Sequence, residues 1–320
     1  MQKREIGTTG VQVTPITFGT SAIGSMPDTY GYGVDEDRAR ATLNAILDGP
    51  ANVIDTSNNY GFGRSEERMG TAFAARGGDL GDTVISTKVD RAQGTDKFDA
   101  DQVRRSFEES LTRMGVDRVG ILYLHDPEYA ADLTEVTREG GGMDTVFKLK
   151  EEGLCDAVGL AMGKTVLQFE LLKDWPFDTM ISHNRMTLLN RNAQEMFDYA
   201  HGRGIAIMNA APYAGGVLAK GSDQVKSISY TEVDDAALEP VRRIEEIAAK
   251  YNVGTGALAL QFSMRDPRIT STICGVSRPE RVAQTLEWAT TDVPEAAWAE
   301  LAELSYSTED PEAMRDYKLG

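Results

Sequence analysis

The feature that most constrains the fold of this chain is an alternation of short apolar runs with amphipathic stretches, repeated about eight times. The apolar runs predict strands, and several are apolar almost throughout, as parallel strands buried on both faces are. The predicted strands cover residues 16–21, 52–57, 83–89, 119–126, 157–162, 179–184, 205–211 and 270–276. The pattern therefore predicts a series of strand–helix units.

The stretches between these strands carry apolar side chains at helical spacing. Asp99 is a candidate N-cap, and the apolar residues after it form one helical stripe at spacings of four, four and three: Val103, Phe107, Leu111 and Met114. Residues 239–251 repeat this pattern. Eight successive strand–helix units favour a closed (β/α)8 TIM barrel over an open sheet. Since such barrels use about 250 residues or more as one unit, we expect a single domain over residues 1–320.

Four segments fall outside the repeating units. Residues 4–15 precede the first strand and predict a β-hairpin. The connections 127–142 and 213–235 and the tail after Leu304 are longer than a barrel requires. Loops of this length are usually functional, and the first two follow carboxyl ends of strands, where barrels carry their chemistry. We therefore expect long loops at the C-terminal face.

Composition narrows the partners of the chain. It has 50 Asp and Glu against 33 Lys and Arg, a net charge of −17 and no basic run, which argues against nucleic-acid binding. No apolar stretch approaches the roughly 20 residues that cross a bilayer, and no signal-peptide pattern is present. The two cysteines and three histidines lack metal-site spacing. We expect a cytoplasmic monomer or small homo-oligomer with a small-molecule substrate, no membrane partner and no metal.

Polar residues gather where three neighbouring strands end. Asp55 ends the second predicted strand and Tyr60 follows it, Lys88 lies near the end of the third, and His125 lies near the end of the fourth. Consecutive strands are neighbours in a parallel barrel, so these side chains are expected to meet at one mouth.

Such a group can move a proton. The unperturbed pKa of Tyr is about 10, and we expect the Lys88 ammonium, held by Asp55, to lower the pKa of Tyr60 toward neutral. Tyr60 is then a general acid or base, with His125 as a second hydrogen-bonding group on the substrate oxygen. A proton shuttle needs a hydride partner to change a carbonyl or alcohol, and nicotinamide is the natural one.

These residues resemble a known catalytic set. Asp55, Tyr60 within Asn-Tyr-Gly-x-Gly-x-Ser-Glu, Lys88 within Ser-Thr-Lys, and His125 resemble the Asp-Tyr-Lys-His tetrad of the aldo-keto reductases. The resemblance extends over most of the chain and implies an enzyme with a (β/α)8 barrel that binds NAD(P) across its mouth, without a Rossmann domain. It also implies that Tyr60 is the acid/base, that Asp55 and Lys88 adjust it, and that His125 orients the substrate.

Within this family, residues 86–91, 124–127 and 185–189 look most like the aldose 1-dehydrogenase branch. That branch includes L-fucose, D-threo-aldose and L-galactose dehydrogenases and pyridoxal 4-dehydrogenase. The resemblance implies oxidation of a sugar, or of a small aldehyde or lactol, at the anomeric carbon to a lactone. An NADPH-dependent carbonyl reductase of the same family remains an alternative.

The cofactor is expected to reach the segment 273–284, which resembles the eighth-strand segment of the family and combines a strand end with a helix N-terminus suited to phosphate. The resemblance implies cofactor contacts from Gly19, Thr20, His183, Pro212, Gly275, Ser277, Arg278, Arg281 and Gln284. Gly275 stands where many NADP-specific members have Lys, which favours NAD, although the two arginines could hold the 2′-phosphate of NADP. Ala210 stands where many members stack Tyr or Trp on the nicotinamide.

Two other functions are open at this point. Lys88 could form a Schiff base in a barrel lyase, or the chain could be a sensor module that retains nicotinamide without turnover. The segment beginning at Gly254 and Gly256 matches the dinucleotide fingerprint G-x-G-x-x-A, but it follows a helical stretch instead of a strand. We therefore expect a turn between helices there.

Overall fold

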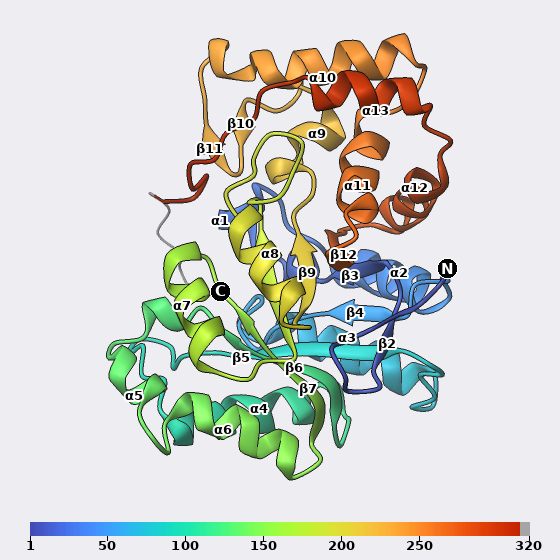
Figure 1. The fold of residues 1–320 in the computed structure, drawn as a ribbon. Helices are drawn as coiled ribbons and strands as arrows, with labels where there is room; N and C mark the ends of the chain where they lie inside the picture. The colour runs from blue at the N-terminus through green and yellow to red at the C-terminus, as the bar shows by residue number, and fades with distance from the viewer. Residues whose placement is uncertain (314–320) are drawn as a thin grey trace.

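The structure is a computed structural model and describes residues 1–313, so the last residues of the predicted single domain, 314–320, lie outside the described residues. Its centre is a closed barrel of parallel strands (Figure 1). In order around the barrel these are β3 (Ile16–Gly19), β4 (Val53–Asp55), β5 (Val84–Val89), β6 (Val119–His125), β7 (Cys155–Ala161), β8 (Thr179–His183), β9 (Ala206–Ala210) and β12 (Ile269–Gly275), which closes on β3. The predicted (β/α)8 barrel is confirmed.

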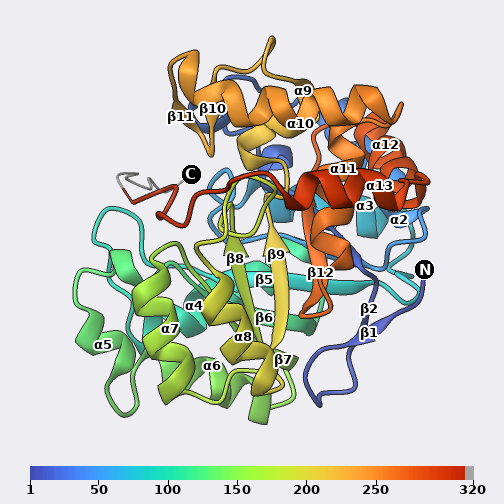
Figure 2. The same cartoon turned by 45° about the horizontal axis from the view of Figure 1, so that its top comes forward.

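Helices follow each barrel strand and cover the outside of the barrel (Figures 1 and 2). They are α2 (Glu36–Leu47), α3 (Arg64–Ala75), α4 (Ala100–Met114), α6 (Gly142–Glu151), α7 (Thr165–Asp174), α8 (Gln194–Gly202), α11 (Thr255–Arg265) and α12 (Pro279–Thr290). The predicted N-cap of α4 is confirmed, because an oxygen of Asp99 accepts a hydrogen bond from the backbone N–H of Gln102 at 3.0 Å. Within residues 1–313, no helix is both long enough and apolar enough to cross a bilayer.

The segments outside the repeating units have structure of their own. The N-terminal hairpin is confirmed as β1 (Arg4–Glu5) paired with β2 (Gln12–Val13). The long connections carry short elements: α5 (Leu133–Thr137), α9 (Val217–Lys220), β10 (Ser227–Ile228) and β11 (Thr231–Glu232). The helix predicted at 239–251 is α10 (Glu239–Lys250), which packs against α13 (Glu295–Ala302). The connection after β3, which contains α1 (Pro27–Tyr30), is also long and was not singled out from the sequence.

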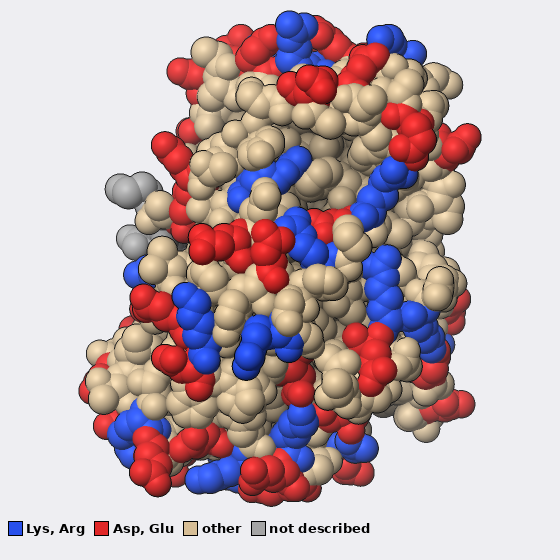
Figure 3. Space-filling view, viewed as in Figure 1, with Lys and Arg blue, Asp and Glu red and all other residues tan. Residues whose placement is uncertain are grey.

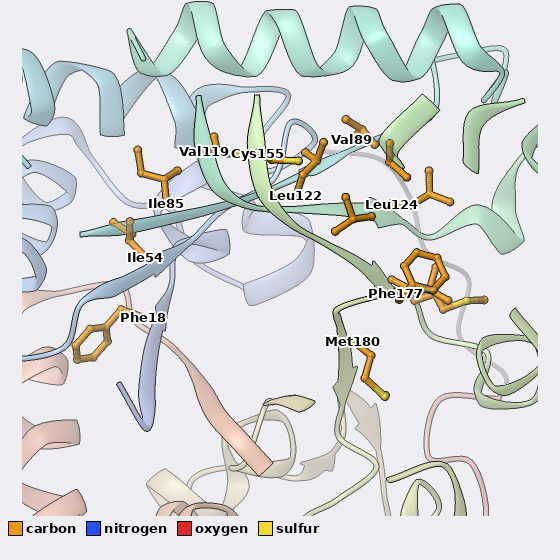
Figure 4. Close-up of a cluster of buried hydrophobic side chains, with 14 of the residues drawn as sticks. Phe18, Ile54, Ile85, Val89, Val119, Leu122, Leu124, Cys155, Phe177 and Met180 are labelled. Atoms are coloured by element: carbon orange, nitrogen blue, oxygen red, sulfur yellow. The ribbon is translucent and has the colours of Figure 1, made fainter. Parts of the chain in front are cut away.

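The barrel strands bury both faces, because successive side chains point to opposite sides of a strand. Outward-facing residues such as Ile54 and Leu122 pack under the covering helices, and Figure 4 shows this layer around β5–β7. Inward-facing residues form a separate cluster, which includes Val53, Ile121, Tyr123, Ala157 and Met208. Residues of the hairpin belong to that inner cluster and close the end of the barrel where the strands begin: Ile6, Val11 and Val13.

The segment with the dinucleotide-like glycines starts in a turn between helices, as expected, with Gly254 as the N-cap of α11 and Gly256 inside that helix. α10 ends at Lys250 and α11 begins at Thr255. A Cβ atom at Gly256 would lie 2.4 Å from the indole ring of Trp288. This glycine therefore allows α11 to pack closely against α12.

Candidate active site at the barrel mouth

The inward-facing residues that end the barrel strands form a ring at the mouth. Each of these residues faces the same side of its strand as the residues of the inner cluster. In barrel order from β3 they are Gly19, Asp55, Lys88, His125, Ala161, His183, Ala210 and Gly275. The ring has two unlike parts. Strands β4, β5, β6 and β8 contribute ionisable side chains, with Ala161 of β7 between the last two, whereas the adjacent strands β9, β12 and β3 contribute only glycine and alanine.

Asp55 and Lys88 form a buried ion pair. Lys88 Nζ lies 2.7 Å from Asp55 Oδ2, with the side chains 2% and 4% exposed respectively. The same ammonium donates to the carbonyl oxygen of Thr56 at 2.6 Å, and the hydroxyl of Ser86 donates to Asp55 Oδ1 at 2.8 Å. The pair is therefore fixed in position and has no net charge.

Tyr60 lies above this pair, on the loop between β4 and α3. Lys88 Nζ is 4.8 Å from the centre of the Tyr60 ring. The loop is held by a close backbone contact, because a Cβ atom at Gly24 would lie 2.8 Å from the Tyr60 carbonyl carbon. Gly61 has a φ of +62°, and its Cβ would lie 2.0 Å from the Gly24 carbonyl oxygen. Both glycines are thus required for the position of Tyr60.

The predicted lowering of the Tyr60 pKa is wrong. Burial of the phenol, and next the negative charge of Asp55, raise the pKa of Tyr60 well above its usual value. The ammonium of Lys88 does not offset this, since Asp55 already pairs with it. Tyr60 therefore carries its proton at neutral pH and is a hydrogen-bond donor at the mouth.

His125 ends β6 and stands edge-on to Tyr60, with ring centres 6.1 Å apart and an interplanar angle of 87°. Its Nδ1 lies 2.7 Å from Asp90 Oδ1, and its Nε2 lies 3.7 Å from Asp126 Oδ2. Burial disfavours the charged imidazole, but the negative charges of Asp126 and Asp90 outweigh burial and raise the pKa of His125 above its ordinary value. The structure thus brings all four residues of the predicted tetrad together.

His183 ends β8 and is reached by the C-terminal tail. Its Nδ1 lies 2.7 Å from Glu312 Oε1, an oxygen that also accepts from Asn184 at 2.7 Å and lies 3.5 Å from Arg185 Nη1. The tail crosses beside the β8–α8 connection (Figure 2), where the N–H of Ser307 bonds to the Leu189 carbonyl at 2.9 Å. Sequence reasoning missed Glu312, because one acidic residue in a tail gives no local signal.

The glycine- and alanine-lined part of the ring leads to the N-terminus of α12. A Cβ atom at Gly275 would meet no atom within 4 Å, so this strand end offers a bare surface. Arg278 is the N-cap residue of α12 and Arg281 lies in its first turn. Within residues 1–313 neither forms an ion pair, and burial, followed by the charge of Arg278, lowers the pKa of Arg281. The Arg281 guanidinium donates to Gln284, a neutral partner.

The remaining predicted cofactor residues lie at the same mouth. The Thr20 hydroxyl is buried and donates to the Asp55 carbonyl at 2.9 Å, so this side chain holds Asp55. The Ser277 carbonyl accepts from Arg38 Nε at 2.8 Å, and Pro212 is buried just after β9. Cofactor contact by these residues stays a prediction.

Comparison with known proteins finds similar sequences and a similar solved structure in one enzyme family. The sequence profile of the Aldo/keto reductase family matches residues 15–305. Pyridoxal 4-dehydrogenase of Microbacterium luteolum is 26% identical, covering 94% of this chain and 96% of that protein. D-threo-aldose 1-dehydrogenase of a Pseudomonas species is 27% identical, covering 92% of this chain and 94% of that protein. The holo form of the aldo-keto reductase AKR11C1 from Bacillus halodurans superposes with a TM-score of 0.77 at 21% identity, covering 99% of this chain and 100% of that one.

Proposed function

The chain belongs to the aldo/keto reductase family, and from this premise we propose that it oxidises an aldose at the anomeric carbon to the lactone, with NAD as the preferred acceptor. It is an oxidoreductase, and its cofactor is a nicotinamide of the NAD(P) class. The choice of sugar and of NAD over NADP is the proposed part.

The observation that carries the proposal is the two-part ring at the mouth. A flat group can lie over β9, β12 and β3, because Ala210, Gly275 and Gly19 project little or nothing there. A phosphate group attached to it can reach the N-terminus of α12, where Arg278 and Arg281 have no acidic partner within residues 1–313. The residues present therefore fit a nicotinamide dinucleotide that lies across the mouth beside the ionisable half of the ring.

When bound, the nicotinamide supplies the acceptor for the hydride that leaves the anomeric carbon; the products are the lactone, the reduced cofactor and one proton. Tyr60 moves that proton. Tyr60 must release its own proton before it can accept one from the sugar hydroxyl. Burial and the charge of Asp55 raise the pKa of Tyr60, and the positive charge of an oxidised nicotinamide bound beside the phenol would offset the effect of Asp55. Lys88 and Asp55 hold this site rigid, and His125 hydrogen-bonds to the substrate beside the reacting group.

A sugar suits the rest of the mouth. Asp126 and Glu128 follow β6, and Arg185 follows β8, so polar groups surround the place where a substrate would lie. Burial and the neighbouring Asp126 raise the pKa of Glu128 to about 7. Two similar proteins of this family act on an aldose and on pyridoxal, which are both small and polar. Gly275 stands where many NADP-specific members of the family have Lys, and this supports NAD over NADP.

Carbonyl reduction with NADPH is the second candidate. Its support is the protonated state of Tyr60, since a phenol with a raised pKa can donate directly to a carbonyl oxygen. Schiff-base chemistry has less support. Lys88 is held by Asp55 and by the carbonyl of Thr56, and an ammonium paired in this way is not a nucleophile.

The test is a substrate panel. Purified protein is incubated with NAD or NADP and a set of aldoses, and with NADPH and a set of small aldehydes, while the absorbance of reduced nicotinamide is followed. We expect reduced cofactor to form with an aldose, faster with NAD, with the lactone as product. Consumption of NADPH by aldehydes without any sugar oxidation would favour the second candidate. Borohydride trapping of a substrate on Lys88 without cofactor would overturn both.

A further inference from the structure

We infer that Asp90 is a positioning residue that fixes the tautomer of His125, so that the neutral imidazole turns the lone pair of Nε2 toward the substrate. In this form His125 accepts a hydrogen bond from a substrate hydroxyl group beside the reacting one, whose own proton goes to Tyr60. The consequence for the reaction rests on the proposed function. The tautomer itself does not, because it is a property of the protein alone.

The first step is the contact between the two side chains. Asp90 Oδ1 lies 2.7 Å from His125 Nδ1, and Asp90 is only 2% exposed. An ionised carboxylate can only accept hydrogen bonds, so Nδ1 must carry the proton. The remaining nitrogen of the neutral ring, Nε2, is then an acceptor.

The second step is that Asp90 cannot turn away. Its other oxygen, Oδ2, accepts from the Ser57 hydroxyl at 2.5 Å and from the backbone N–H of Asn59 at 3.1 Å. Its own backbone N–H bonds to Ser106 at 3.0 Å, and its carbonyl accepts from Gln102 at 2.9 Å. Because Ser57 and Asn59 belong to the loop that bears Tyr60, Asp90 ties that loop to His125.

The third step concerns the charges around the ring. Lys88 of β5 and Asp90 just after it face His125; Asp126, just after the strand of His125, and Tyr60 of the β4–α3 loop also do. The two aspartates favour the charged ring, while burial and Lys88 oppose it. Protonated His125 therefore persists to higher pH than an ordinary histidine, and the neutral acceptor form appears above that pH.

The arrangement also points to a class of substrate. Nε2 of neutral His125 and Oδ2 of Asp126 are both acceptors and lie 3.7 Å apart. A ligand with one donor satisfies only one of them, whereas a polyhydroxylated ligand with neighbouring hydroxyl groups can donate to both. The geometry therefore favours a substrate that carries neighbouring hydroxyl groups beside the reacting one.

The direct test is NMR of the protein labelled with ¹⁵N at histidine. The chain has only three histidines, and His183→Gln and His201→Gln variants assign their signals. Two-bond ¹⁵N–¹H correlations distinguish protonated from unprotonated ring nitrogens. Above its titration we expect His125 to be protonated at Nδ1. A neutral His125 protonated at Nε2 in the wild-type protein would overturn the inference.

Asp90→Asn provides the decisive variant. The N–H of Asn59 cannot rotate, so the amide oxygen stays on its side and the amide NH₂ faces His125 Nδ1. We expect the neutral ring to change to the Nε2–H tautomer and its pKa to fall by about one unit or more. Retention of the Nδ1–H tautomer with an unchanged titration would contradict the role of Asp90.

Two variants serve as controls. Glu312→Gln likewise replaces a carboxylate with an amide, but beside His183, and should leave the His125 signals unchanged. Ser57→Ala removes the hydroxyl that donates to Asp90 and lies 3.2 Å from His125 Nδ1, but it keeps the carboxylate, so the Nδ1–H tautomer should persist; its loss would count against the inference. The wild-type and Ser57→Ala spectra also decide the matter if Asp90→Asn does not fold.

The pH profile then connects the tautomer to the reaction. If the proposed oxidation occurs, kcat/KM should rise with pH as His125 loses its proton. In Asp90→Asn the midpoint should move down by the shift seen in NMR, and the plateau should fall by about tenfold or more. A purely structural role of Asp90 would lower the plateau without moving the midpoint. If no sugar is oxidised but the NMR result holds, only the proposed function fails.

Discussion

At the scale of single residues, the mouth is organised around one buried ion pair. Lys88 and Asp55 contribute a charge of each sign in a region that is almost free of solvent. Such a pair stabilises the fold only while both partners are present, because removing one leaves an uncompensated buried charge.

Lys88→Met is therefore expected to lower the free energy of unfolding by about 3–5 kcal/mol, since Asp55 loses its counter-charge. Adding Asp55→Asn should restore a large part of this loss, because both charges are then gone. Urea unfolding followed by circular dichroism measures both variants. A single variant as stable as the wild type, or a double variant as unstable as the single one, would contradict the pairing.

The sequence predicted the proximity of the tetrad residues but not all of their partners. Asp55, Lys88 and His125 end neighbouring strands, so the alternation of strands and helices is sufficient to bring them together. The contact of Asp90 with His125, the insertion of Glu312 beside His183 and the raised pKa of Tyr60 depend on loop paths and burial. No pattern along the chain encodes these.

At the scale of elements, α12 is the most consequential helix for the proposed function. Its N-terminus follows the bare strand end at Gly275, and neither its N-cap residue Arg278 nor Arg281 of its first turn forms an ion pair within residues 1–313. Free backbone N–H groups and these cations favour an anionic group there. This is the site where the account places the phosphates of the dinucleotide.

Arg281→Gln is expected to weaken binding of NAD and NADP by about tenfold, the loss of one charge-assisted hydrogen bond. Titration of the cofactor by intrinsic fluorescence measures this effect. The KM of the sugar should stay within about twofold, because α12 follows the glycine end of the ring, away from the ionisable side chains. Arg243→Gln on the outer helix α10, where Arg243 pairs with Glu246, is the matched control. Equal effects on cofactor and sugar would contradict the placement.

The long, periodic elements were predictable and the short ones were not. β6 and α4 match their predicted ranges closely, because several turns or alternations repeat the same signal. α1, α5 and the β10–β11 hairpin have two to five residues each, too few for a period to show. They form because the barrel places both ends of each loop, which is tertiary information.

At the scale of the whole molecule, the N-terminal hairpin and the proposed chemistry lie at opposite ends of the barrel. The N-terminal hairpin fills the end where the strands begin, and the ionisable ring occupies the end where they finish. The net charge of the chain is −17, but acidic and basic side chains are interleaved on the face shown in Figure 3 and form no single acidic patch there. The proposed placement of an anionic cofactor therefore depends on the local positive charge of Arg278 and Arg281 at α12.

This separation predicts that the hairpin can be weakened without loss of activity. Ile6 is fully buried in the inner cluster, so Ile6→Ala should lower the free energy of unfolding by about 2–5 kcal/mol. At temperatures where the variant remains folded, its kcat/KM should equal that of the wild type. Thermal unfolding and steady-state kinetics on the same preparation check both statements. A fall in activity without unfolding would show that the two ends are coupled.

The most direct test of the central claim is transfer of deuterium from an aldose labelled at the anomeric carbon. The protein is mixed with NAD and the labelled sugar, and the reduced cofactor is analysed by mass spectrometry. We predict that the label appears in the reduced nicotinamide, and that Tyr60→Phe slows its appearance by about 10² to 10⁴ while Tyr199→Phe, on the outer helix α8, does not. Conversion of the sugar without label in the cofactor, or an unaffected rate in Tyr60→Phe, would contradict the account.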